Sequence, residues 1–161
     1  MDSQPKNEMI FSILKELEIF SDLDESALIA LSHLFEEKEY LQNSIIFEEG
    51  SIGTSMMIIA QGKVRVSQKA NQETEEALKI LHTGEVFGEM ALLEDLPRSA
   101  AIIAHTNVII ISVDRFNFLK FLEQDCRNGL KIMIKLAKTL SSRLREADVK
   151  LKTFVNLTQW I

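Results

Sequence analysis

The chain of 161 residues carries a formal net charge of −6 at pH 7, and 46% of its residues are hydrophobic and 26% charged. This length fits one domain with a sizeable core, and the acidic balance argues against broad nucleic-acid binding, which needs a basic face. The one cysteine, Cys126, excludes a disulfide framework within the chain and favours a reducing, cytoplasmic compartment.

The first part of the chain is predicted to be helical and not a targeting signal. Residues 1–8 are polar, and no apolar run in the chain reaches membrane-spanning length, so no membrane partner is expected. Apolar residues recur at helical spacing over residues 9–19. Asp24 is predicted to cap a second helix over residues 25–35, so that helices are expected within residues 9–36.

From Glu39 onward the pattern changes to short apolar runs separated by turn residues. Such runs predict consecutive short strands, and many of them at regular spacing indicate an antiparallel roll or barrel. The predicted strands cover residues 44–47, 56–60, 64–66, 77–81, 100–104 and 108–113. The polar segment 68–76 is predicted to be a hairpin loop.

The most informative segment runs from Phe87 to Ala100 and has the sequence FGEMALLEDLPRSA. Gly88 allows close approach of the backbone, the residues after it are good helix formers, and Pro97 cannot continue a helix interior. The segment therefore predicts one short helix over residues 88–94. The N–H groups at the start of that helix, together with its dipole, favour a bound anion.

Three side chains of this segment fit a small ligand that carries a phosphate and a sugar hydroxyl. Arg98 can donate two hydrogen bonds to phosphate oxygens, and Ser99 can donate one more. Glu89 is ionised and can only accept, so it suits a ribose 2′-hydroxyl. The alternative is that Glu89 and Arg98 form a surface ion pair beside an ordinary helix.

Helices are predicted again after the last strand. Asp114 is expected to cap a helix that ends at Phe121, and a long helix is expected over residues 127–154. Apolar residues of the long helix follow the a/d pattern of a coiled coil. They are Met133, Ala137, Leu140, Leu144, Ala147, Leu151 and Phe154. This stripe either packs on the chain's own strands or forms the seam of a helix–helix dimer.

The order of residues from Phe87 to Ala100 resembles the phosphate-binding cassette of the cyclic-nucleotide-binding domain family. Members include the bacterial catabolite activator and the regulatory subunits of cAMP-dependent kinase. The resemblance implies an α+β fold, an antiparallel eight-stranded β-roll (a double-stranded β-helix or jelly-roll) with N-terminal helices and a long C-terminal helix. One cyclic-nucleotide-binding domain would then span residues 1–161. Its helices would cover residues 9–36 and 114–154, its roll 39–113 and its cassette 84–100.

One departure from the family is Asn43, where relatives often have glycine in a turn. Asparagine tolerates a positive φ angle better than most residues, so the substitution is mild.

The resemblance also implies a set of ligand-binding residues. Around the phosphate and ribose these are Gly88, Glu89, Met90, Ala91, Arg98 and Ser99. Val66 and Leu78 are expected to contact the purine, and Arg143 of the long helix is expected to lie near the ligand. Trp160 either caps the purine or lies in a frayed terminus.

Selection between adenine and guanine is expected to differ from that of the catabolite activator. That activator reads adenine through a Thr-Ser pair, and this chain has Ala147 and Asp148 instead. Relatives that prefer cGMP often have threonine after the cassette arginine, where this chain has Ser99. The ligand is therefore expected to be cAMP more than cGMP.

These expectations describe a receptor that is not an enzyme. The three histidines lie far apart in sequence, and no nucleophile–base pattern occurs, so neither a metal nor a catalytic residue is predicted. Nucleotide binding would move the long helix and signal to an unknown protein effector. The chain ends at Ile161 without a helix-turn-helix segment, so no DNA partner is expected. The alternative is a structural or oligomerisation module of the same fold with no ligand in use.

Overall fold

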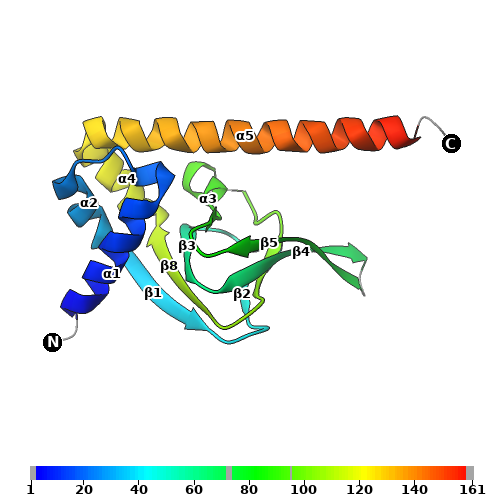
Figure 1. The fold of residues 1–161 in the computed structure, drawn as a ribbon, viewed down its shortest axis with the longest axis horizontal. Helices are drawn as coiled ribbons and strands as arrows, with labels where there is room; N and C mark the ends of the chain where they lie inside the picture. The colour runs from blue at the N-terminus through cyan, green and yellow to red at the C-terminus, as the bar shows by residue number, and fades with distance from the viewer. Residues whose placement is uncertain (1–2, 72–73, 95, 159–161) are drawn as a thin grey trace.

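A roll of antiparallel strands lies between a group of helices at one end and one long helix that runs along its side (Figure 1). The computed structural model describes residues 3–71, 74–94 and 96–158. Within these residues eight strands form two four-stranded sheets. The α+β fold expected from the sequence is therefore confirmed. Trp160, which the sequence analysis singled out, lies outside the described residues.

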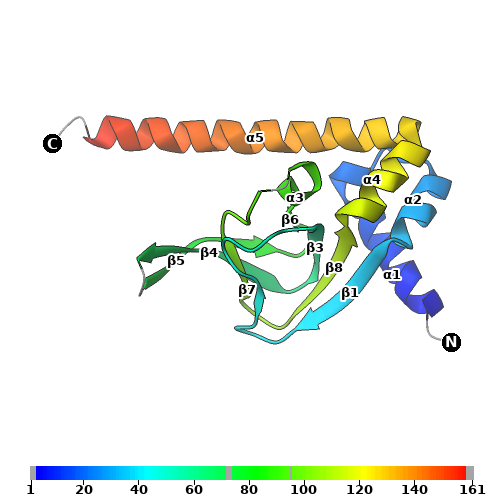
Figure 2. The same ribbon diagram turned by 180° about the vertical axis from the view of Figure 1, so that it is seen from behind.

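The N-terminal helices are α1 (Ser3–Glu16), the short 3-10 helix η1 (Glu18–Phe20) and α2 (Glu25–Ser32). They form because apolar residues recur on one face, and Ile10, Leu14 and Leu31 of that face are buried. Figure 2 shows these helices at the same end as α4, on the side of the roll where β1 begins and β8 finishes.

The predicted end of the second helix is wrong, and its predicted cap is confirmed in position only. The second helix does not reach residue 35, because Phe35 begins strand β1 (Phe35–Tyr40), which pairs with β8 over its whole length. Asp24 does stand at the N-cap position of α2, but its side chain makes no capping hydrogen bond. Its carboxylate accepts instead from Asn128 Nδ2 at 3.2 Å and from Lys131 Nζ at 3.1 Å.

The two sheets have the strand orders β1-β8-β3-β6 and β2-β7-β4-β5, and all pairs are antiparallel. The strands after β1 are β2 (Ile45–Phe47), β3 (Ser55–Gln61), β4 (Lys63–Asn71), β5 (Thr74–His82), β6 (Val86–Phe87), β7 (Ala101–Ala104) and β8 (Val108–Asp114). Asn43, in the turn before β2, has a φ angle of 67°, as its substitution for glycine predicted.

The hairpin of β4 and β5 is longer than the sequence predicted. Much of the polar segment expected as a loop over residues 68–76 belongs to the two strands, which continue to Asn71 and begin again at Thr74. The register places Gln68 opposite Glu76 and Lys69 opposite Glu75. Figure 1 shows this hairpin projecting from the roll beneath the C-terminal half of the long helix.

Two hydrophobic clusters form the core, and strand alternation divides residues between them. Met56 and Ile58 of β3 pack with the helices, whereas Ile59 belongs to the cluster inside the roll. Strand β8 divides in the same way, with Ile111 and Val113 towards the helices. The roll interior therefore meets the helical end through shared strands.

Two helices follow the roll, α4 (Arg115–Gln124) and α5 (Cys126–Thr158). Asp114 caps α4 as predicted, since its side chain accepts from the backbone N–H groups of Phe116 and Asn117. Gly129 brings the two helices close together, because a Cβ atom there would lie 2.7 Å from the carbonyl oxygen of Leu122.

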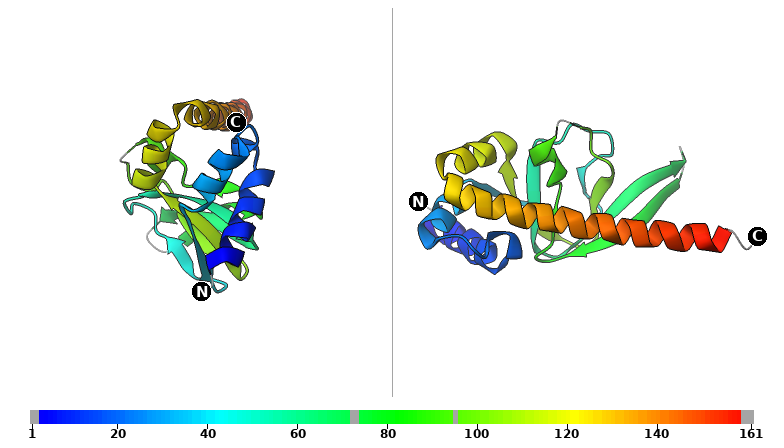
Figure 3. Two further views of the ribbon diagram at one scale, coloured as in Figure 1. Left: turned by 90° about the vertical axis from the view of Figure 1, so that its left-hand side faces the viewer. Right: turned by 90° about the horizontal axis from the view of Figure 1, so that it is seen from above.

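The apolar stripe of α5 has two environments. Near the start of the helix, Met133 and Leu140 pack against the chain's own core. Further along, Leu144 and Leu151 are 65% and 62% exposed. Figure 3 shows the helix seen from above, passing across the roll, with the β4–β5 hairpin extending to one side of its C-terminal half. The first half of the stripe thus packs on the chain itself, and the second half leaves apolar side chains in solvent.

Candidate functional site

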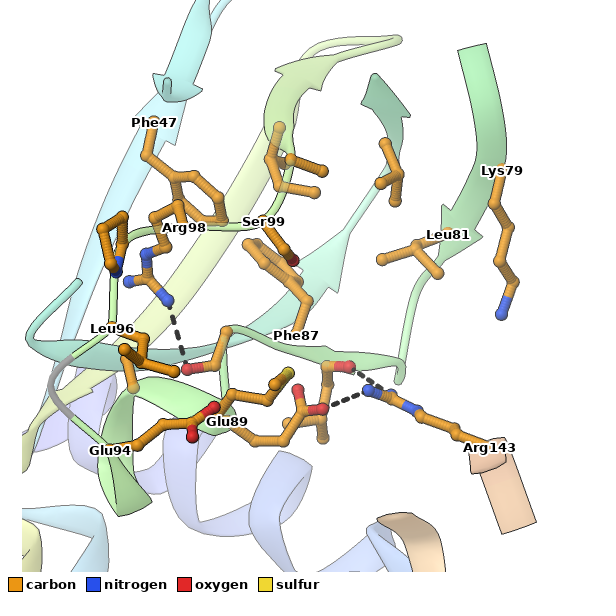
Figure 4. Close-up of a pocket in the computed structure, with 18 of the residues that line it drawn as sticks. Phe47, Lys79, Leu81, Phe87, Glu89, Glu94, Leu96, Arg98, Ser99 and Arg143 are labelled. Atoms are coloured by element: carbon orange, nitrogen blue, oxygen red, sulfur yellow. Dashed lines mark hydrogen bonds and ion pairs between the residues drawn. The ribbon is translucent and has the colours of Figure 1, made fainter. Parts of the chain in front are cut away.

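A cavity of about 420 Å³ lies between the roll, the segment 84–100 and helix α5. That volume is in the range of sites for small organic ligands. Its walls carry apolar side chains from the roll and charged side chains from the cassette and α5 (Figure 4). The lining residues are Phe47, Val66, Lys79, Leu81, Val86, Phe87, Gly88, Glu89, Met90, Ala91, Glu94, Leu96, Pro97, Arg98, Ser99, Ala100, Ile102, Arg143 and Glu146.

The floor of the cavity is the short helix α3 (Met90–Leu93). It is shorter than the predicted helix over residues 88–94. Gly88 has a φ angle of 71°, a left-handed conformation that glycine adopts without strain, and it turns the chain from β6 into the helix. Beyond α3, Pro97 forms an isolated bridge with Ile52, which holds the end of the segment against the turn before β3.

Arg98 is buried in one wall of the cavity although its side chain is charged. The residue is only 9% exposed. Its guanidinium donates hydrogen bonds to the carbonyl oxygens of Gly88 at 3.2 Å and Ser55 at 2.9 Å. Its Cζ lies 4.2 Å from the ring centroid of Phe47, a cation–π contact. Burial lowers the pKa of Arg98 more than the nearby negative charge of Glu89 raises it, so the pKa lies below its usual value. A pre-positioned guanidinium of this kind can bind an anion in the cavity.

Two glycines make room for this guanidinium. A Cβ atom at Gly53 would lie 2.4 Å from Arg98 Nε, and one at Gly88 would lie 2.5 Å from Arg98 Nη1. The sequence reasoning missed Gly53 and Phe47. Two glycines within four residues, at Gly50 and Gly53, were the available signal for a close backbone approach.

Glu89 is the buried carboxylate of the site, at 4% exposure. Arg143 of α5 donates to it through Nη1, and Arg143 Nη2 donates to the carbonyl oxygen of Val86 at 2.9 Å. The predicted alternative of a surface ion pair between Glu89 and Arg98 is therefore wrong. Both residues are buried, Glu89 pairs with Arg143, and Arg98 bonds to backbone carbonyls.

Most of the residues singled out from the sequence line the same cavity. They are Val66, Gly88, Glu89, Met90, Ala91, Arg98, Ser99 and Arg143. Leu78 is the exception, because it is 56% exposed and does not line the cavity. Successive residues of a strand face opposite sides, so Lys79 and Leu81 are the β5 residues that face the cavity. The register of β5 cannot be read from the sequence alone, and the prediction was off by one residue.

A sequence model described as the cyclic nucleotide-binding domain matches residues 37–125. The chain belongs to the cyclic nucleotide-binding domain family. The matched region contains the roll, the short helix and the cavity residues of the segment 84–100. Domains of this family bind cyclic nucleotides and are typical of bacterial regulators and of protein kinase regulators.

Individual relatives agree with this assignment. The chain is 35% identical over 123 residues to the cyclic AMP receptor protein of Thermus thermophilus, which covers 76% of this chain and 55% of that protein. It is 34% identical over 118 residues to human cGMP-dependent protein kinase 2, which covers 72% of this chain and 16% of the kinase. The chain thus spans about half of the first relative and a small part of the second.

The fold is shared with solved structures at low sequence identity. A cyclic nucleotide-binding domain from Methylobacillus flagellatus matches with a TM-score of 0.78 and 22% identity, over 92% of this chain and 83% of that one. Among the described residues, no three His, Cys, Asp or Glu side chains are grouped so that they could hold a metal ion. No helix in the described part of the chain combines the length and apolar character needed to cross a membrane.

Proposed function

We propose that this chain is a non-enzymatic cyclic-nucleotide receptor in the cytoplasm, with cAMP preferred to cGMP. The observation that carries the proposal is that one cavity with apolar walls is also lined by Arg98, Ser99 and Glu89. A cyclic nucleotide needs one cationic donor for its phosphate, one acceptor for its ribose hydroxyl and an apolar surface for its base.

In the proposed complex the phosphate lies beside the backbone of Gly88, Met90 and Ala91. Arg98 and Ser99 donate hydrogen bonds to it. Glu89 accepts from the 2′-hydroxyl, and Val66 contacts the base together with Leu81. Serine at position 99, where cGMP-preferring relatives often have threonine, supports cAMP.

Signalling would pass through the contact between Arg143 and Glu89. A ligand that bonds to Glu89 alters the partner of Arg143 and so the position of α5 against the roll. The ligand shifts this equilibrium only by the difference in its affinity for the two positions of the helix. The output would be a changed surface on α5, offered to a protein effector or to a second copy of the chain.

The second candidate is an oligomerisation module with no ligand in use. The exposed apolar residues Leu144 and Leu151 on α5 favour it, because they fit a helix–helix seam. It makes no use of the buried charges around the cavity.

Calorimetric titration with cAMP, cGMP and a cyclic dinucleotide tests the proposal. We expect saturable binding of cAMP with one site per chain, weaker binding of cGMP and no binding of the dinucleotide. Absence of heat with all three ligands, in a folded sample, would favour the oligomerisation module. Incubation with cAMP followed by a search for AMP checks that the receptor does not hydrolyse its ligand.

A further inference from the structure

Arg98 is held by one other segment of the chain, residues 47–55, which lies beside the end of the cassette. The backbone of Arg98 makes two hydrogen bonds with this segment. The N–H of Gly50 donates to the carbonyl oxygen of Arg98, and the N–H of Arg98 donates to the carbonyl oxygen of Ser51, each at 2.8 Å. The segment begins with Phe47, a cavity residue to which the proposed function assigns no role.

The hydrogen bonds of the Arg98 side chain do not by themselves fix the plane of its guanidinium. Nη1 donates to the carbonyl oxygen of Gly88 at 3.2 Å, and Nη2 donates to that of Ser55 at 2.9 Å. A planar group that is held at two atoms can still rotate about the line that joins them. The ring of Phe47 opposes this rotation, because its centroid lies 4.2 Å from Arg98 Cζ, in a cation–π contact with the guanidinium.

Phe47 is itself held in place by the roll. It is the last residue of β2, and it pairs in register with Ile102 of β7. Its side chain packs against the hydrophobic cluster inside the roll, and its ring centroid lies 6.0 Å from that of Phe87. Figure 4 shows Phe47 and Arg98 at one end of the cavity and Lys79 at the other. The ring therefore acts at the phosphate end of the proposed complex.

The orientation of a guanidinium decides which phosphate oxygens it can bind. Its N–H groups point outward in one plane, so an acceptor must lie near that plane. Among the described residues, the bonds to carbonyl oxygens use two of the five N–H groups of Arg98, and others remain for a ligand. The two exocyclic oxygens of a cyclic phosphate point in different directions, so a guanidinium held in one plane distinguishes them.

We infer that Phe47 is a positioning residue, which holds the guanidinium plane of Arg98 so that it binds one exocyclic phosphate oxygen of the ligand in preference to the other. The inference rests on the proposed function, because it requires a cyclic nucleotide with its phosphate at Arg98.

The test uses the two phosphorothioate diastereomers of cAMP, in each of which sulfur replaces a different exocyclic oxygen. Sulfur is the weaker hydrogen-bond acceptor, so the ratio of the two dissociation constants reports how strictly Arg98 distinguishes the oxygens. Each diastereomer, and cAMP itself, is titrated calorimetrically into the wild-type chain, Phe47→Leu and Phe47→Tyr. Leucine removes the ring and keeps an apolar side chain, whereas tyrosine keeps the ring.

We expect the wild type to bind one diastereomer at least about fivefold more tightly than the other. Phe47→Leu should lower this ratio by about half or more and should weaken cAMP binding about fivefold, the size of one cation–π contact in a partly desolvated site. Phe47→Tyr should keep both wild-type values. The ratio is the deciding measurement, because a general loosening of the fold would weaken the binding of both diastereomers alike.

Tyr40 supplies the matched control. Its side chain packs against the same hydrophobic cluster, and its ring has a cation of its own, since Lys38 Nζ lies 5.0 Å from the ring centroid. Tyr40 does not line the cavity. Tyr40→Leu should therefore lower the free energy of unfolding but keep the diastereomer ratio and the affinity for cAMP. Phe47→Met is a second variant without the ring, to be used if urea unfolding shows that Phe47→Leu does not fold.

The outcomes separate this inference from the proposed function. If the wild type binds both diastereomers equally, or if the ring-free variant keeps the wild-type ratio, Phe47 does not orient Arg98, while binding of cAMP still supports a nucleotide receptor. If Phe47→Tyr or Tyr40→Leu loses the ratio as well, the effect is one of packing and the inference is wrong. If the wild type does not bind cAMP, the proposed function fails and the inference fails with it.

Discussion

Arg143 of α5 bonds to Glu89 beside α3, although 54 residues of sequence separate them. The same guanidinium also bonds to the carbonyl oxygen of Val86 in strand β6. This one side chain therefore connects the long helix to strand β6 and to the residue that precedes α3. It is also the point at which a ligand that bonds to Glu89 would act on α5.

Arg143→Ala should destabilise the folded chain. The substitution leaves the buried carboxylate of Glu89 without its cation, and an unpaired buried polar group costs about 1–3 kcal/mol. Since the Arg143 side chain is 43% exposed, we expect about 1–2 kcal/mol by urea unfolding. Arg145→Ala is the matched control, because Arg145 is exposed and donates to Ser141 on its own helix. Equal effects of the two variants would contradict a special role for Arg143.

Arg98→Ala should weaken cAMP binding by at least tenfold. It removes the guanidinium proposed for the phosphate, and a charge-assisted hydrogen bond contributes roughly 1.5–3 kcal/mol. Calorimetric titration measures the loss. Arg98 also donates to Gly88 and Ser55, so the variant's unfolding must be followed in parallel. An unchanged dissociation constant in a folded variant would exclude Arg98 from the phosphate site.

The fold was predictable where local pattern and long-range pairing agree. Apolar runs gave β2, β3, β7 and β8, and the turn and helix formers gave α3. Strand β1 was missed because its residues after Phe35 are mostly charged. Pairing with β8, which no local pattern shows, determines that strand.

The candidate site was predictable where one segment carries it. Glu89, Arg98 and Ser99 lie within eleven positions of one another and came directly from the sequence. Lys79 and Glu146 were missed, because their place in the cavity depends on the register of β5 and on where α5 crosses the roll. Both depend on contacts between distant parts of the chain. Knowledge of the β5 register would have shown that Lys79 and Leu81, and not Leu78, face the cavity.

The 2′-deoxy analogue of cAMP should bind much more weakly than cAMP itself. In the proposed complex Glu89 exchanges the hydrogen bond from Arg143 for one from the ribose 2′-hydroxyl, or accepts both. Loss of a donor to a buried carboxylate costs about 1–3 kcal/mol, a five- to more than hundredfold weaker affinity. Competition against labelled cAMP measures the ratio. Equal affinities would mean that Glu89 only holds Arg143.

Acid should release the polar cluster at the start of α5. Hydrogen bonds from Lys131 and Asn128 lower the pKa of Asp24, and those from Asn128 lower the pKa of Asp125. A lowered pKa in the folded chain means that these carboxylates stabilise it above their unfolded pKa, about 3.9. This stabilisation is lost as the pH falls through the lower folded values.

The matching measurement is the free energy of unfolding of wild type and Asp24→Asn between pH 7 and pH 3. We expect a constant difference above about pH 5, which shrinks below the ordinary aspartate pKa as Asp24 of the wild type is protonated. Asp148→Asn, at an exposed position of α5, serves as the control. A difference that grows towards low pH would have the wrong sign for a lowered pKa.

The exposed half of α5 is expected to form a dimer seam coupled to the ligand. Leu144 and Leu151 occupy equivalent positions one heptad apart and are both largely exposed, whereas Arg143 beside them enters the cavity. Replacing both leucines by glutamate should give a monomer in sedimentation and should change nucleotide affinity. The reason is that any tightening of the dimer by nucleotide requires an equal tightening of nucleotide binding by the dimer.

Ser142 and Val149 supply the control for that experiment, because they are also one heptad apart and exposed but lie away from the stripe. Their replacement by glutamate adds the same charge to the same helix and should leave assembly and affinity unchanged. A wild type that sediments as a monomer at all concentrations, with and without cAMP, would contradict the seam. The exposed leucines would then have to bind another protein or remain in solvent, and α5 would couple to nucleotide only through Arg143.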